Sequence, residues 1–183
     1  MWDPETAETI HTLRHPYGVY AVCAVDVDGV QLLASASGGP DGRVYLWDPQ
    51  TGDRTGHHWR ASTAVLTMCS LRIGNQSVVA AATVDGETWL WDAATGQCVH
   101  APEAPGLRRT SAINALCSVE HAGRTLLVTA SSDRTVCLWD PATATQVMEI
   151  PVRHVSLGAA WFEGFLIVGL DRGLQVLSLN LPS

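Results

Sequence analysis

The sequence contains no lysine, and all 11 of its basic residues are arginine. Long apolar runs are also absent: they end within about ten residues, whereas a membrane-spanning helix needs roughly 20. The sequence does not open with a basic region followed by an apolar stretch, so it does not indicate a secretory leader. We therefore expect a folded, cytoplasmic protein that does not span a membrane. The choice of arginine over lysine, with abundant Ala and Val, favours a bacterial source.

Charge and cysteine spacing exclude further classes. The formal net charge of -7 argues against a general surface for nucleic acid or anionic membranes. The five cysteines form no CxxC pair, so neither a disulfide framework nor a zinc motif is indicated. Cys23, Cys69 and Cys117 stand 46 and 48 residues apart in "VYAVCAV", "VLTMCSL" and "INALCSV". We interpret them as buried thiols that pack as small apolar groups in a reducing compartment.

One short phrase recurs along the chain. It appears as "DGRVYLWDPQTG" at 41–52, "DGETWLWDAATG" at 85–96 and "DRTVCLWDPATA" at 133–144. Each copy carries an Asp and, six residues later, a Trp: Asp41 with Trp47, Asp85 with Trp91 and Asp133 with Trp139. A fourth copy keeps this offset between Asp171 and Leu177, where the Trp is lost. Repetition at a fixed period indicates a repeat architecture.

Each repeat contains four short β-like runs separated by turn signals such as Asp28-Gly29 and Thr51-Gly52. No sustained helical periodicity appears in the unit. The first three runs are apolar on both alternating faces, which is typical of strands held between neighbouring sheets. The sequence therefore predicts an all-β protein whose units bury their faces by stacking.

A unit of 44 to 48 residues with four strands, and with Trp-Asp closing the third, resembles the WD40-repeat family of β-propellers. The resemblance covers essentially the whole chain. It implies blades of four antiparallel strands, four blades per chain. The expected bounds are a closing outer strand at 1–13, blade 1 at 14–59, blade 2 at 60–107, blade 3 at 108–152 and blade 4, lacking its outer strand, at 153–183.

The two incomplete ends complement each other. Strand 8–13 is expected to pair with the third strand of a last blade, around Leu174 to Leu179, and to cover its edge. Four blades would need about 90° between neighbours and eight about 45°. The resemblance implies about seven blades for a ring of such units, so four are too few. We therefore predict an eight-bladed homodimer in which each chain completes the last blade of the other, joined head to tail. A closed four-bladed monomer and half of a larger ring are the alternatives.

The resemblance also implies a polar set in each blade, in which a His before the inner strand bonds to a strand Ser or Thr, to the turn Asp and to the Trp. In blade 1 this set is His15, Ser35, Asp41 and Trp47, and His154 keeps the His position in blade 4. Ala61 and Arg109 replace the His in blades 2 and 3. Asp85 and Asp133, which accompany Trp91 and Trp139, must therefore find other partners.

Arginine replaces the glycine that usually precedes that His, at Arg14, Arg60, Arg108 and Arg153. One interpretation is a ring of guanidinium groups that binds carboxylates or phosphates. Its candidate partner-binding residues are Arg14, Tyr17, Arg60, Arg108, Arg109 and Arg153. The other interpretation is that these arginines pair with the turn carboxylates on their own face, which the need to satisfy buried charge favours.

No catalytic, cofactor-binding or metal-ligating set can be nominated. We therefore predict a non-catalytic scaffold that binds itself and a protein or acidic peptide on the arginine-bearing face. The alternative is a small-anion sensor or enzyme that uses the axial channel.

Overall fold

The computed structural model describes Glu5 and residues 8–100, 108–121 and 123–179. These residues form four antiparallel sheets, blades 1 to 4, and no helix. Blade 1 contains β1 (Val19–Val27), β2 (Val30–Ser37), β3 (Arg43–Trp47) and β4 (Arg54–Arg60). Blade 2 contains β5 (Val65–Ile73), β6 (Gln76–Thr83), β7 (Thr88–Asp92) and β8 (Cys98–His100). The described chain accordingly offers no helix that could cross a membrane.

The remaining strands complete two more sheets. Blade 3 contains β9 (Ile113–His121), β10 (Arg124–Ser131), β11 (Thr135–Asp140) and β12 (Thr145–Pro151). Blade 4 contains only β13 (Ser156–Phe162), β14 (Phe165–Leu170) and β15 (Gly173–Ser178). In every sheet, strands that follow one another in sequence are neighbours. The predicted all-β fold is confirmed.

Tight turns fix the register within each sheet. Between β1 and β2, Val27 pairs with Val30, so only Asp28 and Gly29 make the turn. Their φ angles are 53° and 83°, and positive values at both central residues fit the right-handed twist of a hairpin. This is the reason for an Asp-Gly pair at the turn.

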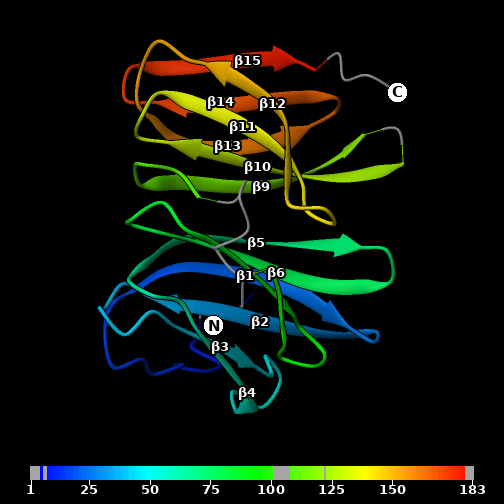
Figure 1. Cartoon of the computed structure of the whole chain (residues 1–183). Helices are drawn as coiled ribbons and strands as arrows, with labels where there is room; N and C mark the ends of the chain where they lie inside the picture. Colours follow the sequence, from blue (N-terminus) through cyan, green and yellow to red (C-terminus); the bar gives the residue numbers. More distant parts are fainter. Residues whose placement is uncertain (1–4, 6–7, 101–107, 122, 180–183) are drawn as a thin grey trace.

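The blades pack face to face in chain order, with blade 1 and blade 4 at opposite ends of the stack (Figure 1). Their inner strands contact in the sequence β1 to β5, β5 to β9 and β9 to β13. Three separate apolar clusters fill the three junctions between successive blades. Because both faces of blades 2 and 3 are covered, β6 and β10 bury consecutive apolar residues that face both ways, as the sequence predicted.

The repeated tryptophans are packing groups. Trp47, Trp91 and Trp139 are between 2% and 4% exposed. Trp91 stacks on Trp59 of the preceding blade, with ring centroids 5.6 Å apart and planes 2° from parallel. The repeated Trp therefore joins one blade to its neighbour as well as closing its own third strand.

The aligned cysteines pack at the blade junctions, but Cys23, Cys69 and Cys117 are partly buried and not fully buried as predicted. No disulfide joins any cysteine of the described chain. Burial raises the pKa of both the Cys23 and the Cys117 thiol to about 12. They lie on the inner strands β1, β5 and β9.

The N-terminal segment does not reach blade 4 of its own chain. Nε2 of His11 lies 2.8 Å from the carbonyl oxygen of Gln50, in the turn after β3. Segment 8–13 thus lies against blade 1, and the described sheet of blade 4 ends on β15. The pairing expected between 8–13 and the third strand of blade 4 is not made within one chain, because the two ends are separated by the length of the stack (Figure 1).

Candidate binding face

Two sets of turns meet at one end of the stack. The turn that enters each inner strand donates a backbone hydrogen bond to the turn between the second and third strands of the preceding blade. These bonds, 2.8 to 2.9 Å long, run from Ala61 to Gly42, from Arg109 to Gly86 and from Val152 to Arg134. Since strands alternate in direction, both sets of turns lie at the same end. We call this end, which carries Arg14, Arg60, Arg108 and Arg153, the arginine face.

All four arginines of this face are exposed. Nε of Arg60 donates to the backbone oxygen of Asp41 at 3.2 Å. The Arg108 guanidinium lies 3.7 Å from the carboxylate of Glu87, yet 62% of the Arg108 side chain remains exposed. The guanidinium groups therefore face solvent at the end of the stack.

The turn aspartates pair with other residues. Asp41 lies 3.5 Å from Arg43, and Asp133 lies 3.0 Å from Arg109. Asp85 accepts hydrogen bonds from the hydroxyls of Thr63 and Thr83, and Asp171 lies 3.4 Å from His154. In the described residues, no contact joins one of these four carboxylates to Arg14, Arg60, Arg108 or Arg153.

Arg109 takes the place that the resemblance gives to histidine. Its side chain is only 15% exposed, and it donates to Asp133, to the Thr135 hydroxyl at 2.7 Å and to Glu149 at 3.1 Å. Burial disfavours ionisation of Asp133, but hydrogen bonds from Thr135 and Arg109 outweigh it and lower the pKa of that carboxyl. Arg109 is thus held inside blade 3, apart from the four exposed arginines.

Blade 1 forms most of the polar set implied by the resemblance. Nε2 of His15 lies 2.7 Å from the Ser35 hydroxyl, which also accepts the indole N–H of Trp47 at 2.6 Å. Asp41 pairs with Arg43 instead. Burial, followed by the charge of Arg54, lowers the pKa of His15. A neutral imidazole therefore completes this set.

Blades 2 and 3 support their tryptophans differently. The Trp139 indole donates to the Thr129 hydroxyl at 2.9 Å, because Thr129 occupies the register position of Ser35. In blade 2 the same register position is occupied by Ala81, which has no hydroxyl to accept the indole N–H of Trp91. Trp91 instead stacks with both Trp59 and Trp89.

The backbone register shifts the expected residues of blade 4. Val152 makes the turn bond that Ala61 and Arg109 make, so Arg153 and His154 lie one and two residues beyond the aligned position. Blade 4 has a shorter turn, in which Leu170 pairs with Gly173. The hairpin before that turn is shorter too: β13 and β14 have 7 and 6 residues, whereas β1 and β2 have 9 and 8, so the repeat spacing does not carry over to His154.

Aromatic side chains flank the arginine face in blade 1. Tyr17 and Tyr20 are 50% and 63% exposed. A Cβ on Gly38 would come 2.6 Å from the Tyr20 ring, and one on Gly39 would come 2.4 Å from the Tyr17 ring. The two glycines thus allow the tyrosines to lie flat along the enlarged turn. Trp59, by contrast, is 4% exposed and covers a blade junction.

The sequence analysis missed Glu87. This residue is 8% exposed and accepts hydrogen bonds from the Ser62 hydroxyl and from the Trp89 indole, at 3.3 Å for the latter. Arg108 lies beside it. The available signal was an acidic residue immediately before β7, at a position where the sequence otherwise turns apolar.

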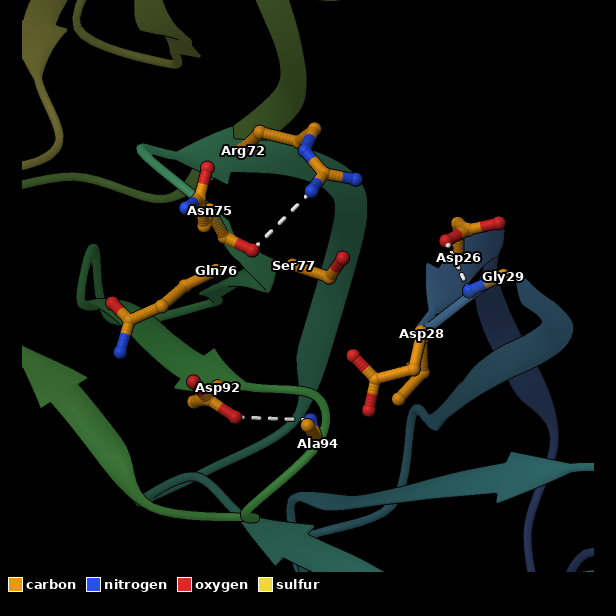
Figure 2. A pocket seen from close by; sticks show the side chains of 10 residues that line it. Asp26, Asp28, Gly29, Arg72, Asn75, Gln76, Ser77, Asp92 and Ala94 are labelled. Atoms are coloured by element: carbon orange, nitrogen blue, oxygen red, sulfur yellow. Dashed lines mark hydrogen bonds between the residues drawn. The ribbon is translucent and has the colours of Figure 1, made fainter.

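The opposite end of the stack contains a hollow of about 400 Å³ between blades 1 and 2. Figure 2 shows the turn at Asp26–Gly29 on one side and Arg72, Asn75 and Asp92 on the other. Asp92 and Asp26 accept backbone N–H groups of their own turns, from Ala94 and Gly29. Within the described ranges, no group of three ligating residues could hold a metal ion.

Comparison with known proteins gives a family match and two fold matches. Residues 7–48 and 96–140 match the family described as "WD domain, G-beta repeat". No curated protein matches the chain. In fold it is similar to the computationally designed Ika4 protein, at 19% identity and a TM-score of 0.71 over 94% of this chain and 100% of that one. The designed Ika8 protein matches with the same identity and TM-score over 97% of this chain, which spans 51% of the Ika8 chain.

Proposed function

We propose that this chain, a member of the WD40-repeat family, is a non-catalytic interaction scaffold that binds an acidic protein or peptide on the arginine face. The observation that carries the proposal is the exposure of Arg14, Arg60, Arg108 and Arg153 at one end of the stack, with the turn carboxylates paired elsewhere. Guanidinium groups bind carboxylates with paired, charge-assisted hydrogen bonds. WD40 domains generally mediate protein interactions and are generally not catalysts.

The arrangement of charge and aromatic groups supports this surface. Four of the 11 arginines are exposed at this one end, in a chain whose net charge is -7. Tyr17 and Tyr20 lie beside that cluster and offer the flat, rigid contact area that interfaces favour. An acidic segment with an aromatic or apolar residue is the partner chemistry that fits.

The test compares three proteins for binding of a fluorescent polyglutamate peptide at increasing salt. The variant Arg14→Ala/Arg60→Ala/Arg108→Ala/Arg153→Ala should keep the melting temperature of the wild type and lose the salt-sensitive binding. A double variant Arg72→Ala/Arg124→Ala removes two arginines from the opposite end of the stack and should bind as the wild type does. Equal binding by all three proteins would refute the proposed face.

A small-anion sensor is the second candidate, and the same variants test it. Inorganic phosphate that binds the wild type, and competes with the peptide, would favour the anion site. Phosphate without effect at millimolar concentration would favour the peptide surface.

We also propose that two chains form an eight-bladed homodimer of the cytoplasm. The open stack supports this, because four blades that end far apart leave both end blades uncovered (Figure 1). Five cysteines without a disulfide suit a reducing compartment. Light scattering tests the assembly: a mass of two chains is expected, and a mass of one chain at every concentration would refute it and favour a monomer.

A further inference from the structure

The N-terminal segment occupies the place of an outer strand. Nε2 of His100, in β8, lies 3.1 Å from the carbonyl oxygen of Ala142 in the next blade. Nε2 of His11 lies 2.8 Å from the carbonyl oxygen of Gln50. Gln50 and Ala142 hold the same position, three residues after the repeated Trp of their blades. Segment 8–13 therefore contacts blade 1 as the outer strand of blade 2 contacts blade 3.

Among the described residues, no inner strands accompany such an outer strand on that side of blade 1. A cavity of about 390 Å³ lies there instead, between Thr9, Leu13 and the apolar side chains of Val19, Val22 and Leu33. Val19 and Val22 are 43% and 59% exposed. The Nδ1 atom of the His15 ring is buried at this side without a hydrogen-bond partner in the described residues.

Blade 4 presents the converse arrangement at the other end of the stack. It has three strands in the described chain, so β15 forms its outer edge. Leu174, Val176 and Leu157 are 74%, 59% and 57% exposed on its uncovered side. At the other junctions, side chains of this kind are buried in the apolar clusters between blades. Blade 4 thus lacks both an outer strand and a following blade.

We infer that segment 8–13 is the outer strand of blade 4 of a second copy, whose side chains Leu174 and Val176 cover the cavity beside Val22 of the first. We call this contact, between blade 4 of one copy and blade 1 of the other, the seam. It continues the packing that already joins the blades within one chain. A single chain cannot form the seam with itself because its two ends are separated. Two such seams close a ring by two-fold rotation. The inference rests on the proposed homodimer and specifies which surfaces meet.

One consequence concerns the arginine face. Each chain contributes its exposed arginines to the same end of the ring, so the face is complete only when both copies are present. Segment 8–13 leads directly into Arg14, and the seam therefore brings Arg14 of one copy beside the last blade of the other.

The experiment measures mass by sedimentation equilibrium over a range of concentrations. Wild-type protein should have the mass of two chains. Val22→Asp and Leu174→Asp change exposed residues at the two ends of the stack, and each alone should give the mass of one chain, because both seams use both surfaces. Val84→Asp changes a valine that is 48% exposed in the middle of the stack and should leave the mass of two chains.

The possible results of this experiment distinguish a wrong seam from the absence of a dimer. A two-chain mass for Leu174→Asp, with Val22→Asp monomeric, would mean that two blade 1 faces meet, which refutes the seam and leaves the dimer intact. A wild-type mass of one chain would refute both.

Hydrogen exchange on the wild-type dimer gives a second test that needs no variant. Amides of β15 that point away from β14 should exchange slowly, and rapid exchange there would refute the strand pairing.

Discussion

The guanidinium of Arg109 lies 3.0 Å from the carboxylate of Asp133 and takes the position that His15 has in blade 1. Two side chains of different size and charge thus perform one structural task. His15 bonds to a strand hydroxyl, whereas Arg109 spans the turn to reach a carboxylate and a second hydroxyl. The two blades thus use different residues at the same position before the inner strand.

We predict that Arg109→Ala destabilises the protein by roughly 1–3 kcal/mol, because Asp133 loses its charged partner, keeps only the hydrogen bonds from Thr135 and stays largely covered. Arg108→Ala, one residue earlier on an exposed side chain, should change stability by less than about 0.5 kcal/mol. Urea unfolding of both variants provides the comparison. Equal free energies of unfolding for the two variants would contradict the assigned role.

Trp91→Ala should cost about 3–5 kcal/mol, because it removes a buried ring that stacks with both Trp59 and Trp89 and leaves a cavity. Thermal unfolding followed by circular dichroism measures the loss. A variant that melts at the temperature of the wild type would show that the stacked rings do not hold blades 1 and 2 together.

Thiol labelling of the native protein near pH 8, mapped by mass spectrometry, should modify the exposed Cys98 first. Cys23 and Cys117 should label slowly until denaturant is added, because burial raises the pKa of each thiol to about 12 and little thiolate forms. Labelling of Cys23 as rapid as that of Cys98 would contradict its position at a blade junction.

Stability should fall between pH 7 and pH 5 in part because of His15. Its pKa in the folded state is lowered, so on acidification the unfolded chain takes up a proton near the ordinary value of 6.5 before the folded chain does. The contribution is present above that pH and is lost below it. His15→Gln should reduce this slope, and an unchanged pH profile of urea midpoints would refute the assignment.

Arg134 has a φ of 69° in the turn of blade 3, where blades 1 and 2 have Gly42 and Gly86 at φ of 57° and 83°. Arg134→Gly should stabilise the protein by up to about 1 kcal/mol by removing this strain. Gly86→Ala should destabilise it, since a Cβ there would come 2.4 Å from the oxygen of Arg109. Midpoints that move in the same direction for both variants would contradict this explanation.

The spacing of Asp and Trp was sufficient to predict the sheets. Each Trp ends the third strand of its blade, and each Asp lies in the turn that precedes that strand. It was insufficient in blade 4. There the Trp is replaced by Leu177, and the shorter hairpin of β13 and β14 changes the repeat spacing without leaving a recognisable signal. Spacing alone therefore placed His154 two residues from where the backbone puts it.

The candidate site was predictable in its positions but not in its pairings. The sequence identified Arg109 as the replacement for His and Arg108 as the replacement for Gly. Two adjacent arginines point in different directions, and only the path of the backbone decides which one enters the blade. Glu87 escaped notice because its partners, Ser62 and Trp89, come from different segments and share no motif.

Within the described residues, each blade packs only against the blades next to it in the chain. The free energy of unfolding is therefore close to a sum of one contribution from each blade and one from each junction between neighbouring blades. Blades 2 and 3 have two junctions each, whereas blades 1 and 4 have one within the chain. Opening of an isolated chain should therefore begin at its ends and advance inward, as fraying does in a helix. Closing the chain into a ring removes both starting points, so assembly would protect even the central blades, which no other chain touches.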